Sequence, residues 1–296
     1  MKKLILTLCL FVPLLTFAQD DLESLLNEIS ADSARRNYVT SAYKSTHVIN
    51  MQSTELKAPG SLEFRISHRF GPVNGGAYQL FGLDQATIRL SFEYGFNDWI
   101  SAGFGRSTYE KTYDFFSKFA LLKQQTGKVN MPISLLYYID MAINGLRNED
   151  PTREYAFSTR MSYVHQLIIG RKFSDRASLL FSPTLVHKNL VATTDDQNIT
   201  YALGFAGRLK ISNRVALTTE YIYRVPPSEE PPSYTNFHDS FSVGVDIETG
   251  GHVFQIHLSN SLPMFDRAFI TETNQRWEDG GVHLGFNITR DFQLKK

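Results

Sequence analysis

Charged side chains recur on one face of the segments in which apolar and polar residues alternate. Eight of them are basic: Arg65, Arg69, Arg89, Lys118, Arg160, Arg208, Lys210 and Arg224. Six are acidic: Glu63, Glu93, Asp140, Glu220, Asp246 and Glu248. If this face lines the inside of a closed sheet, the charges would form a selectivity lining for a polar or weakly anionic solute. The near balance of signs suits an ion-pair network filling a narrow interior equally well, and both hypotheses stay open.

Histidines mark two further candidate sites. His257 and His283 are predicted on the same inward face of adjacent strands, where two imidazoles would meet. Zinc and copper usually need three or four ligands, so we expect hydrogen-bonded histidines, no metal and no cofactor. His68 and His165 are predicted on the outward face, near opposite strand ends. An outward-facing lipid hydrolase needs a nucleophile, a base and an orienting group within reach; no such triad can be read, so we expect no enzyme.

One repeated unit between Leu62 and Phe292 positions all of these residues. Runs of roughly ten residues alternate apolar and polar side chains, as in Phe241 to Glu248. A period of two over this length predicts β-strands with one apolar and one polar face. About twelve such runs occur. We therefore predict an all-β protein, a single antiparallel up-and-down transmembrane β-barrel of about twelve strands, with an apolar face toward lipid.

The connections between the runs alternate in length. The long ones are predicted near residues 71–85, 105–112, 144–154, 189–198, 226–239 and 260–280. The short ones, predicted as tight turns, are 96–98, 125–127, 173–175, 212–214 and 249–251. If the first strand begins in the periplasm, every long connection falls outside the cell, as in bacterial outer-membrane barrels. A soluble β-sandwich has no reason to show this asymmetry.

The N-terminal residues precede the barrel, which is predicted over residues 61–296. Residues 1–18 resemble a signal peptide, with Lys2 and Lys3 before an apolar stretch too short to span a bilayer. The only cysteine, Cys9, follows Leu8, so lipid attachment is not expected. Residues 19–60 are predicted as a periplasmic helix and an extended segment, with residues 20–29 available to a periplasmic partner. Residues 46–53 would form either an extra strand or a plug.

Composition agrees with a membrane barrel in contact with outer-membrane lipid. The chain has 22 Phe and 14 Tyr residues, which suits aromatic girdles at the membrane interfaces. Lys plus Arg and Asp plus Glu number 30 each. This neutral balance gives no electrostatic reason to expect nucleic acid as a partner.

Several motifs carry a resemblance to a known family. They include the sequences Ile66-Ser67-His68-Arg69-Phe70-Gly71, residues 81–87, residues 93–95, Gly103-Phe104-Gly105-Arg106-Ser107, residues 111–114 and residues 127–132. With these motifs the chain resembles a Bacteroidetes family of uncharacterised β-barrel outer-membrane proteins. The resemblance implies a barrel with no assigned activity, so it supplies no catalytic residues.

Three functions are compatible with these observations. The first is a passive pore or transporter for a small polar solute, exported by its signal peptide to the outer membrane of a Gram-negative cell. The second is a non-conducting scaffold barrel that docks a periplasmic or surface partner. The third and most remote is an outer-membrane lipid hydrolase. The sequence does not reveal the solute, the oligomeric state, or whether the lumen is open or plugged.

Overall fold

The computed structural model describes residues 36–148, 152, 154–229 and 231–295. They belong to two compact units: a small one, with residues up to 39 and 124–132, and a large one, with residues 40–123 and from 133 onward. The predicted signal peptide and the helix predicted over residues 20–29 lie outside the described residues and stay predictions. No helix among the described residues is long and apolar enough to cross a membrane.

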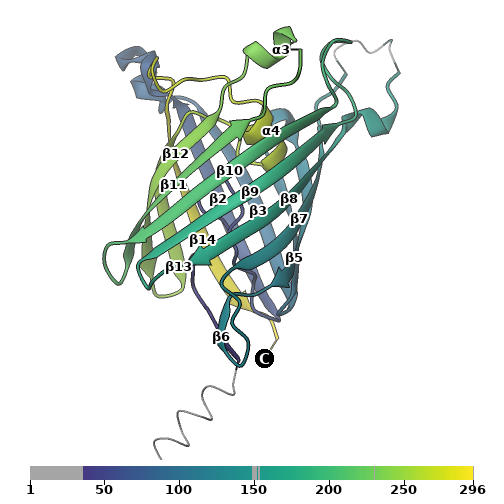
Figure 1. Cartoon of the computed structure of the whole chain (residues 1–296). Coiled ribbons are helices and arrows are strands. Elements are labelled where there is room, and N and C mark those ends of the chain that lie inside the picture. The colour runs from purple at the N-terminus through teal and green to yellow at the C-terminus, as the bar shows by residue number, and fades with distance from the viewer. Residues whose placement is uncertain (1–35, 149–151, 153, 230, 296) are drawn as a thin grey trace, which may run out of the picture. The chain divides into compact units, whose positions relative to one another are not determined.

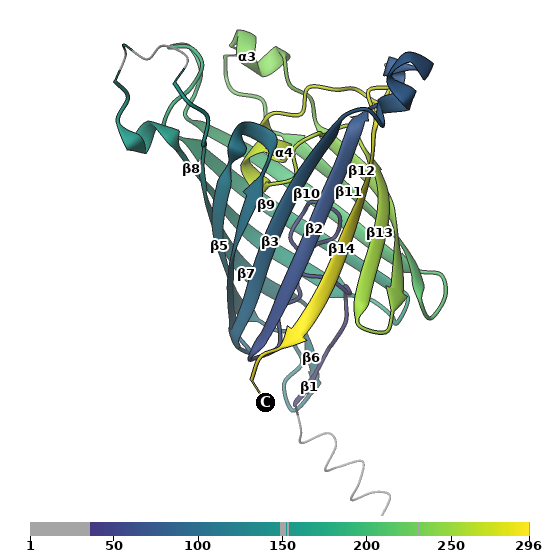
Figure 2. The same cartoon turned by 180° about the vertical axis from the view of Figure 1, so that it is seen from behind.

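The large unit is a closed antiparallel barrel of twelve strands (Figures 1 and 2). Its strands are β2 (Ser61–Pro72), β3 (Ala86–Asn97), β4 (Ile100–Ser107), β5 (Tyr113–Leu122), β7 (Ser134–Ile143), β8 (Met161–Lys172), β9 (Ala177–Lys188), β10 (Ile199–Lys210), β11 (Val215–Arg224), β12 (Ser240–Thr249), β13 (His252–Ser259) and β14 (His283–Gln293). Consecutive strands pair, and β14 pairs with β2 to close the sheet. The predicted fold class, strand number and antiparallel order are confirmed.

Side chains alternate between lumen and exterior in the sense expected of a membrane barrel. On β2, Glu63, Arg65 and Arg69 are buried, whereas Phe64 and Ile66 between them are partly exposed. Many large apolar side chains face outward around the barrel. A soluble protein would bury these side chains, so the arrangement requires an apolar surrounding such as lipid.

The two ends of the barrel differ, as the connection lengths predict. One end, here called the long-loop end, carries short helices in its connections: η1 (Val73–Gly75), η2 (Ala77–Gly82), η3 (Tyr109–Lys111), η4 (Phe157–Arg160), α3 (Pro232–Thr235) and α4 (Asp266–Thr271). The opposite end, the short-turn end, joins most strand pairs by tight turns, and the last strand ends there (Figure 2).

The tight turn predicted at residues 125–127 is wrong. Residues 125–127 form a short strand, β6 (Gln125–Gly127), which pairs with β1 (Arg36–Tyr38) in a separate two-stranded sheet. Gln125 also bridges to Met131 within the same connection. The pairing partner lies almost ninety residues away in the sequence, so local turn composition carries no signal for it.

The barrel wall is mostly polar on one side of the lumen, whereas the other side, here called the apolar side, mixes apolar and polar side chains. The polar side carries the charges of β2, β3 and β5. Apolar side chains point inward from β7 to β11, including Leu136, Tyr138, Val164, Ile168 and Val186. The prediction of a polar inward face therefore holds only in part for these strands, which also bury the predicted charges Asp140, Arg208 and Glu220. The sequences of β7 and β8 indicate the difference, because Leu135 to Ile139 and Leu167 to Ile169 are continuous apolar runs, typical of strands covered on both faces.

Candidate functional site

The lumen is filled by residues 43–57, here called the plug. The plug folds as a tight hairpin in which the Val48 N–H donates to Met51 O at 2.8 Å and the Ser53 N–H donates to Thr46 O at 2.9 Å. Both of its ends lie at the short-turn end, since Lys172 bonds Thr40 O and Gly60 N bonds Gly95 O. Residues 40–60 belong to the same compact unit as the barrel strands.

Glu220 of β11 holds the tip of the plug. Its carboxylate accepts hydrogen bonds from the backbone N–H groups of Ile49 at 3.2 Å, Asn50 at 2.9 Å and Met51 at 2.9 Å. The Asn50 side-chain amide donates to the same carboxylate at 2.6 Å. Glu220 is 1% exposed. A buried carboxylate needs such donors, because an ionised group without partners is strongly disfavoured away from water.

Basic and amide side chains bind the acceptor groups of the same tip. Arg65 of β2 donates to Ile49 O at 2.5 Å, and Arg69 donates to Asn50 Oδ1 at 2.8 Å. Gln255 of β13 donates to Val48 O. The acidic side chain of Glu220 therefore faces backbone donors of the plug, and the basic side chains of Arg65 and Arg69 face its acceptors. This complementarity indicates that several lumen charges serve to hold the plug.

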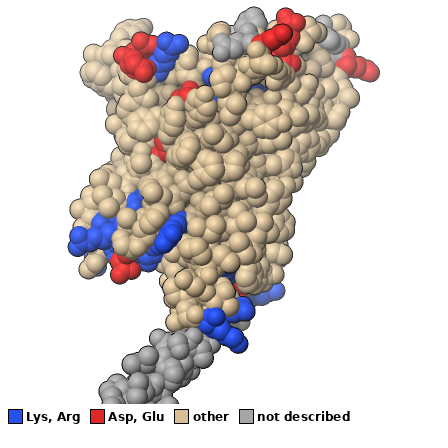
Figure 3. Space-filling view, in the orientation of Figure 1, with Lys and Arg blue, Asp and Glu red and all other residues tan. Residues whose placement is uncertain are grey.

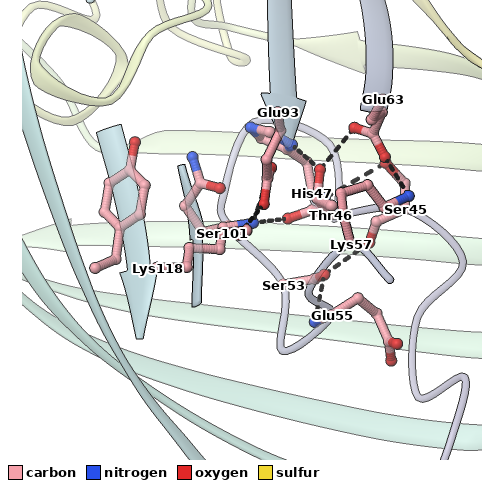
Figure 4. A network of polar contacts seen from close by, with 12 residues as sticks. Ser45, Thr46, His47, Ser53, Glu55, Lys57, Glu63, Glu93, Ser101 and Lys118 are labelled. Carbon is pink, nitrogen blue, oxygen red and sulfur yellow. Dashed lines mark hydrogen bonds and ion pairs between the residues drawn. The ribbon is translucent and has the colours of Figure 1, made fainter. Parts of the chain in front are cut away.

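A second polar network holds the base of the plug (Figure 4). Glu63 accepts from Thr46 Oγ1 at 2.7 Å and from Lys57 Nζ at 2.8 Å. From β5, Lys118 Nζ donates to Thr46 O at 2.7 Å and lies 3.6 Å from Glu93 Oε2. Each carboxylate thus has a lysine beside it, so the network is close to neutral without any bound ion.

This network contains the one set of potential metal ligands found among the described residues: His47, Glu63 and Glu93, whose ligand atoms lie within 4.8 Å of one another. Burial, Arg65 and Lys118 hold the pKa of His47 well below its usual range, so its imidazole is neutral. However, Lys57 and Lys118 already neutralise the two carboxylates. A divalent cation would have to displace these ammonium groups, and we assign the cluster to plug binding.

Helix α4 closes the lumen from the long-loop end and meets the plug. All six of its residues are buried. The Asp266 carboxylate accepts from Gln52 of the plug at 3.0 Å, and from Tyr138 at 2.8 Å and Gln166 at 3.1 Å on the wall. Phe269 and Ile270 join the apolar side of the lumen, where Tyr43, Val48 and Met51 of the plug also pack. The lumen is therefore closed by two segments that contact each other.

Acidification is expected to stabilise this closed state through Asp266. Burial raises the pKa of Asp266 to about 6, although the hydrogen bonds from Gln52 and Tyr138 and the charge of Arg89 oppose the rise. The folded state then binds the proton more tightly than the unfolded chain, so stability is gained below pH 6 and lost as the pH rises through it. Between pH 7 and pH 5 the unfolding temperature should rise by about 3 °C, from about 1 kcal/mol.

Unfolding temperatures at pH 5 and pH 7, followed by circular dichroism in detergent, would measure this effect. Asp266→Asn should remove most of the increase, whereas Asp195→Asn in an exposed loop should leave it intact. An increase of the same size in Asp266→Asn would show that the effect does not arise at Asp266.

The other predicted lumen charges bind the wall and the loops. Arg89 forms an ion pair with Asp114, and Arg208 pairs with Glu248 at 3.1 Å and with Asp246 at 3.7 Å. Arg224 donates to Phe237 O in a long connection, and Lys210 ends β10 at the short-turn end. Asp140 is buried, and neither of its carboxylate oxygens has a hydrogen-bond partner among the described residues. Arg160 lies in η4, one residue before β8, and donates to loop groups.

The four histidines are also placed by the structure. His257 is buried with Nε2 at 2.9 Å from Arg69, and His283 Nδ1 lies 2.8 Å from Phe70 O. Outside the barrel, His68 stacks on Phe286 with ring centroids 4.9 Å apart, and His165 contacts Tyr137 OH at 2.7 Å. Among the described residues, neither His68 nor His165 has a side-chain hydrogen bond to a serine or a carboxylate.

A cavity of about 700 Å³ lies on the outer side of α4, at the long-loop end. Arg160, Lys188, Arg224 and Arg267 line it, together with Glu110 and Glu272. Arg267 and Lys188 form ion pairs with Glu272. Arg160 and Arg224 instead donate mainly to backbone carbonyl groups. The alternation of the strands predicts Arg160 and Arg224 but not Lys188, which is the last residue of β9. Arg267 and Asp266 lie in a long connection and have no strand face to reveal them.

A family model described as a membrane bound beta barrel domain matches residues 43–292. The chain belongs to this family. The resemblance to an uncharacterised barrel family is thereby confirmed, and the protein is a membrane-bound β-barrel. The match begins at Tyr43, so the membrane bound beta barrel domain includes the plug as well as the strands.

Solved structures similar to this membrane bound beta barrel domain include two porins and an outer membrane channel. The NanC porin is 10% identical, with a TM-score of 0.48 over 79% of this chain and 100% of its own. The KdgM porin is 10% identical, with a TM-score of 0.47 over 78% and 99%. An outer membrane channel from Pseudomonas putida F1 is 10% identical, with a TM-score of 0.49 over 80% and 97%. No curated protein sequence matches the chain.

Proposed function

We propose that this protein is an outer-membrane channel for a small polar solute, and that its own plug is the gate. In this proposal the long-loop end faces the outside of the cell and the short-turn end faces the periplasm, as in other bacterial barrels. The observation that carries the proposal is the plug itself: a hairpin of the same chain fills the lumen and enters and leaves it at one end. A permanently open pore does not fit this geometry.

The character of the wall favours a gate over a permanent filling. Buried wall groups such as Asp140, Ser182, Thr218 and His257 have polar atoms without hydrogen-bond partners among the described residues. If the contact between wall and plug were dry and permanent, each of these polar groups would stay without a partner, at a cost of about 1–3 kcal/mol in stability. When the plug withdraws, these wall groups would be free to form hydrogen bonds with a polar solute. The charged cavity at the long-loop end would be the place where the solute first binds.

The second candidate function, a non-conducting scaffold, is favoured by one observation. Tyr43, Val48 and Met51 of the plug pack on the apolar side of the lumen, which stabilises the closed state. A disulfide can decide between the two functions. An added Cβ on Gly170 of β8 would lie 3.6 Å from Thr54 Cβ in the plug, within the range of disulfide bonds.

The experiment uses a Thr54→Cys, Gly170→Cys double variant in planar bilayers. The wild-type protein should be closed for most of the time, with brief openings. The oxidised double variant should lose these openings, and a reducing agent should restore them. The single variant Thr54→Cys controls for the substitution. Openings that survive oxidation would show a route that bypasses the plug, and a wild-type protein that never opens would favour the scaffold.

A further inference from the structure

The outer surface of the barrel carries an apolar groove near the short-turn end, across β8 to β11. The groove has a volume of about 500 Å³. Two cross-strand rows define it. The row farther from the turns contains Ile169, Phe181, Phe205 and Tyr221, which are register partners across β8, β9, β10 and β11. These aromatic and aliphatic side chains form the edge of the groove that is nearer the long-loop end.

The second row, which lies nearer the turns, is the floor of the groove. It contains Arg171, Leu179, Gly207 and Thr219, again register partners. Gly207 has no side chain and Thr219 has a small one, so the surface is lower here than at Phe205 and Leu209 on either side along β10. A Cβ on Gly207 would meet its nearest neighbour, Leu179 Cδ2, at 3.3 Å. The backbone therefore does not require glycine at this position, and the missing side chain shapes the surface.

Basic residues gather where the groove reaches the short-turn end. The β8–β9 and β10–β11 hairpins, residues 171–176 and 210–214, carry five of them: Arg171, Lys172, Arg176, Lys210 and Arg214. Asp175 is the one acidic residue in these two segments. The β3–β4 turn on another part of the rim carries Asp98 and no basic residue. Figure 3 shows Lys and Arg gathered at the lower left, below an uncharged surface.

Arg171 belongs to both the groove and the basic group. Its side chain is exposed, lines the groove, and stacks on the Phe173 ring with its guanidinium carbon 4.9 Å from the centroid. Stacking leaves the N–H groups of the guanidinium available for an anion. An apolar groove that ends at a basic rim matches one kind of molecule in a membrane, an acyl chain that carries an anionic headgroup.

We propose that this groove binds an anionic phospholipid of the leaflet at the short-turn end. One acyl chain lies along the floor at Gly207, between Phe205 and Leu209. The headgroup phosphate accepts hydrogen bonds from Arg171 and lies near Arg176. This leaflet is the periplasmic one in the orientation proposed above. The lipid site itself does not depend on whether the lumen conducts.

The test uses the full-length protein in a mild detergent, with equal amounts of phosphatidylglycerol and phosphatidylcholine in mixed micelles. Lipid that stays bound through purification is measured by mass spectrometry. Each basic residue at a lipid surface favours an anionic lipid by about fivefold. We therefore expect phosphatidylglycerol to exceed phosphatidylcholine by about tenfold on the wild-type protein, and Arg171→Gln with Arg176→Gln to reduce this preference to nearly equal binding.

A second variant tests the groove without changing charge. Gly207→Leu fills the floor and should reduce retention of phosphatidylglycerol several-fold. Ala102→Leu places the same side chain on the outer face of β4 and should not reduce it. Because Arg176 lies in an exposed turn, Arg176→Gln alone keeps the test decisive if the double variant folds poorly.

Three results would overturn the proposal. They are equal retention of the two lipids by the wild-type protein, a preference that survives the loss of both arginines, and a mass showing that a second copy of the chain covers the groove.

Discussion

Glu220→Gln should convert a mostly closed barrel into one with frequent and long openings. The Glu220 carboxylate accepts three backbone N–H groups at the plug tip and the Asn50 side-chain amide. Glutamine places an NH₂ group where one acceptor oxygen was, so at least one buried donor loses its partner and the charge that strengthens the other bonds disappears. Charged hydrogen bonds contribute about 1.5–3 kcal/mol each.

The expected loss of plug affinity is therefore about 3 kcal/mol, which corresponds to roughly a hundredfold change in an equilibrium constant. Single-channel recording should show the open probability rising by about this factor. Thr218→Val is the matched control. Thr218 lies two residues away on the same strand, faces inward, and bonds neither the plug nor another described group through its hydroxyl. Unchanged closure in Glu220→Gln would mean that the apolar contacts of Val48 and Met51 hold the plug unaided.

Arg69→Ala should cause the largest loss of stability of any single substitution considered. Arg69 is fully buried and joins three parts of the protein. It donates to Asn50 Oδ1 of the plug, to Ser261 O and Pro263 O of the last long connection, and contacts His257 on the wall. Alanine leaves several buried acceptors without a donor, at a cost of about 1–3 kcal/mol each, and a cavity beside them.

We expect the unfolding temperature of Arg69→Ala to fall by about 10 °C, from a loss of about 4 kcal/mol. Arg69→Lys should restore little of it, because one ammonium group cannot match a planar guanidinium that reaches acceptors on several sides. The exposed Arg147→Ala controls for loss of charge and should unfold as the wild type does. A small change in Arg69→Ala with a normal conductance would show that the last long connection is held by α4 alone.

The sequence predicts the barrel well because its strands obey a local rule. Each strand needs only its own alternation, so twelve strands and the two unlike ends follow from residues such as those of β2 and β12. The charges of Glu63, Arg65, Arg69 and Lys118 were found for the same reason, since they occupy alternate positions. Their role was not readable, because their partners are backbone groups of the plug, which any sequence can supply.

The positions of the plug and of α4 cannot be predicted from such local rules. Residues 46–53 have few of the features of a regular element, and their structure depends on donors and acceptors from β2, β11 and β13 together. Asp266 lies in a long connection and becomes important only because α4 folds inward onto Gln52 and Tyr138. The sheet between β1 and β6 was missed because its two strands are far apart in the chain.

The path of the plug has a mechanical consequence. Because both legs of the hairpin leave the lumen at the same end, no part of the chain would have to thread through the barrel if the plug withdraws as proposed. Its second leg runs directly into β2, so a withdrawn plug stays tethered at the mouth by residues 58–60. A short tether keeps the local concentration of a segment in the millimolar range. Re-entry is then an intramolecular event that needs no other molecule, and the barrel would close itself after each opening.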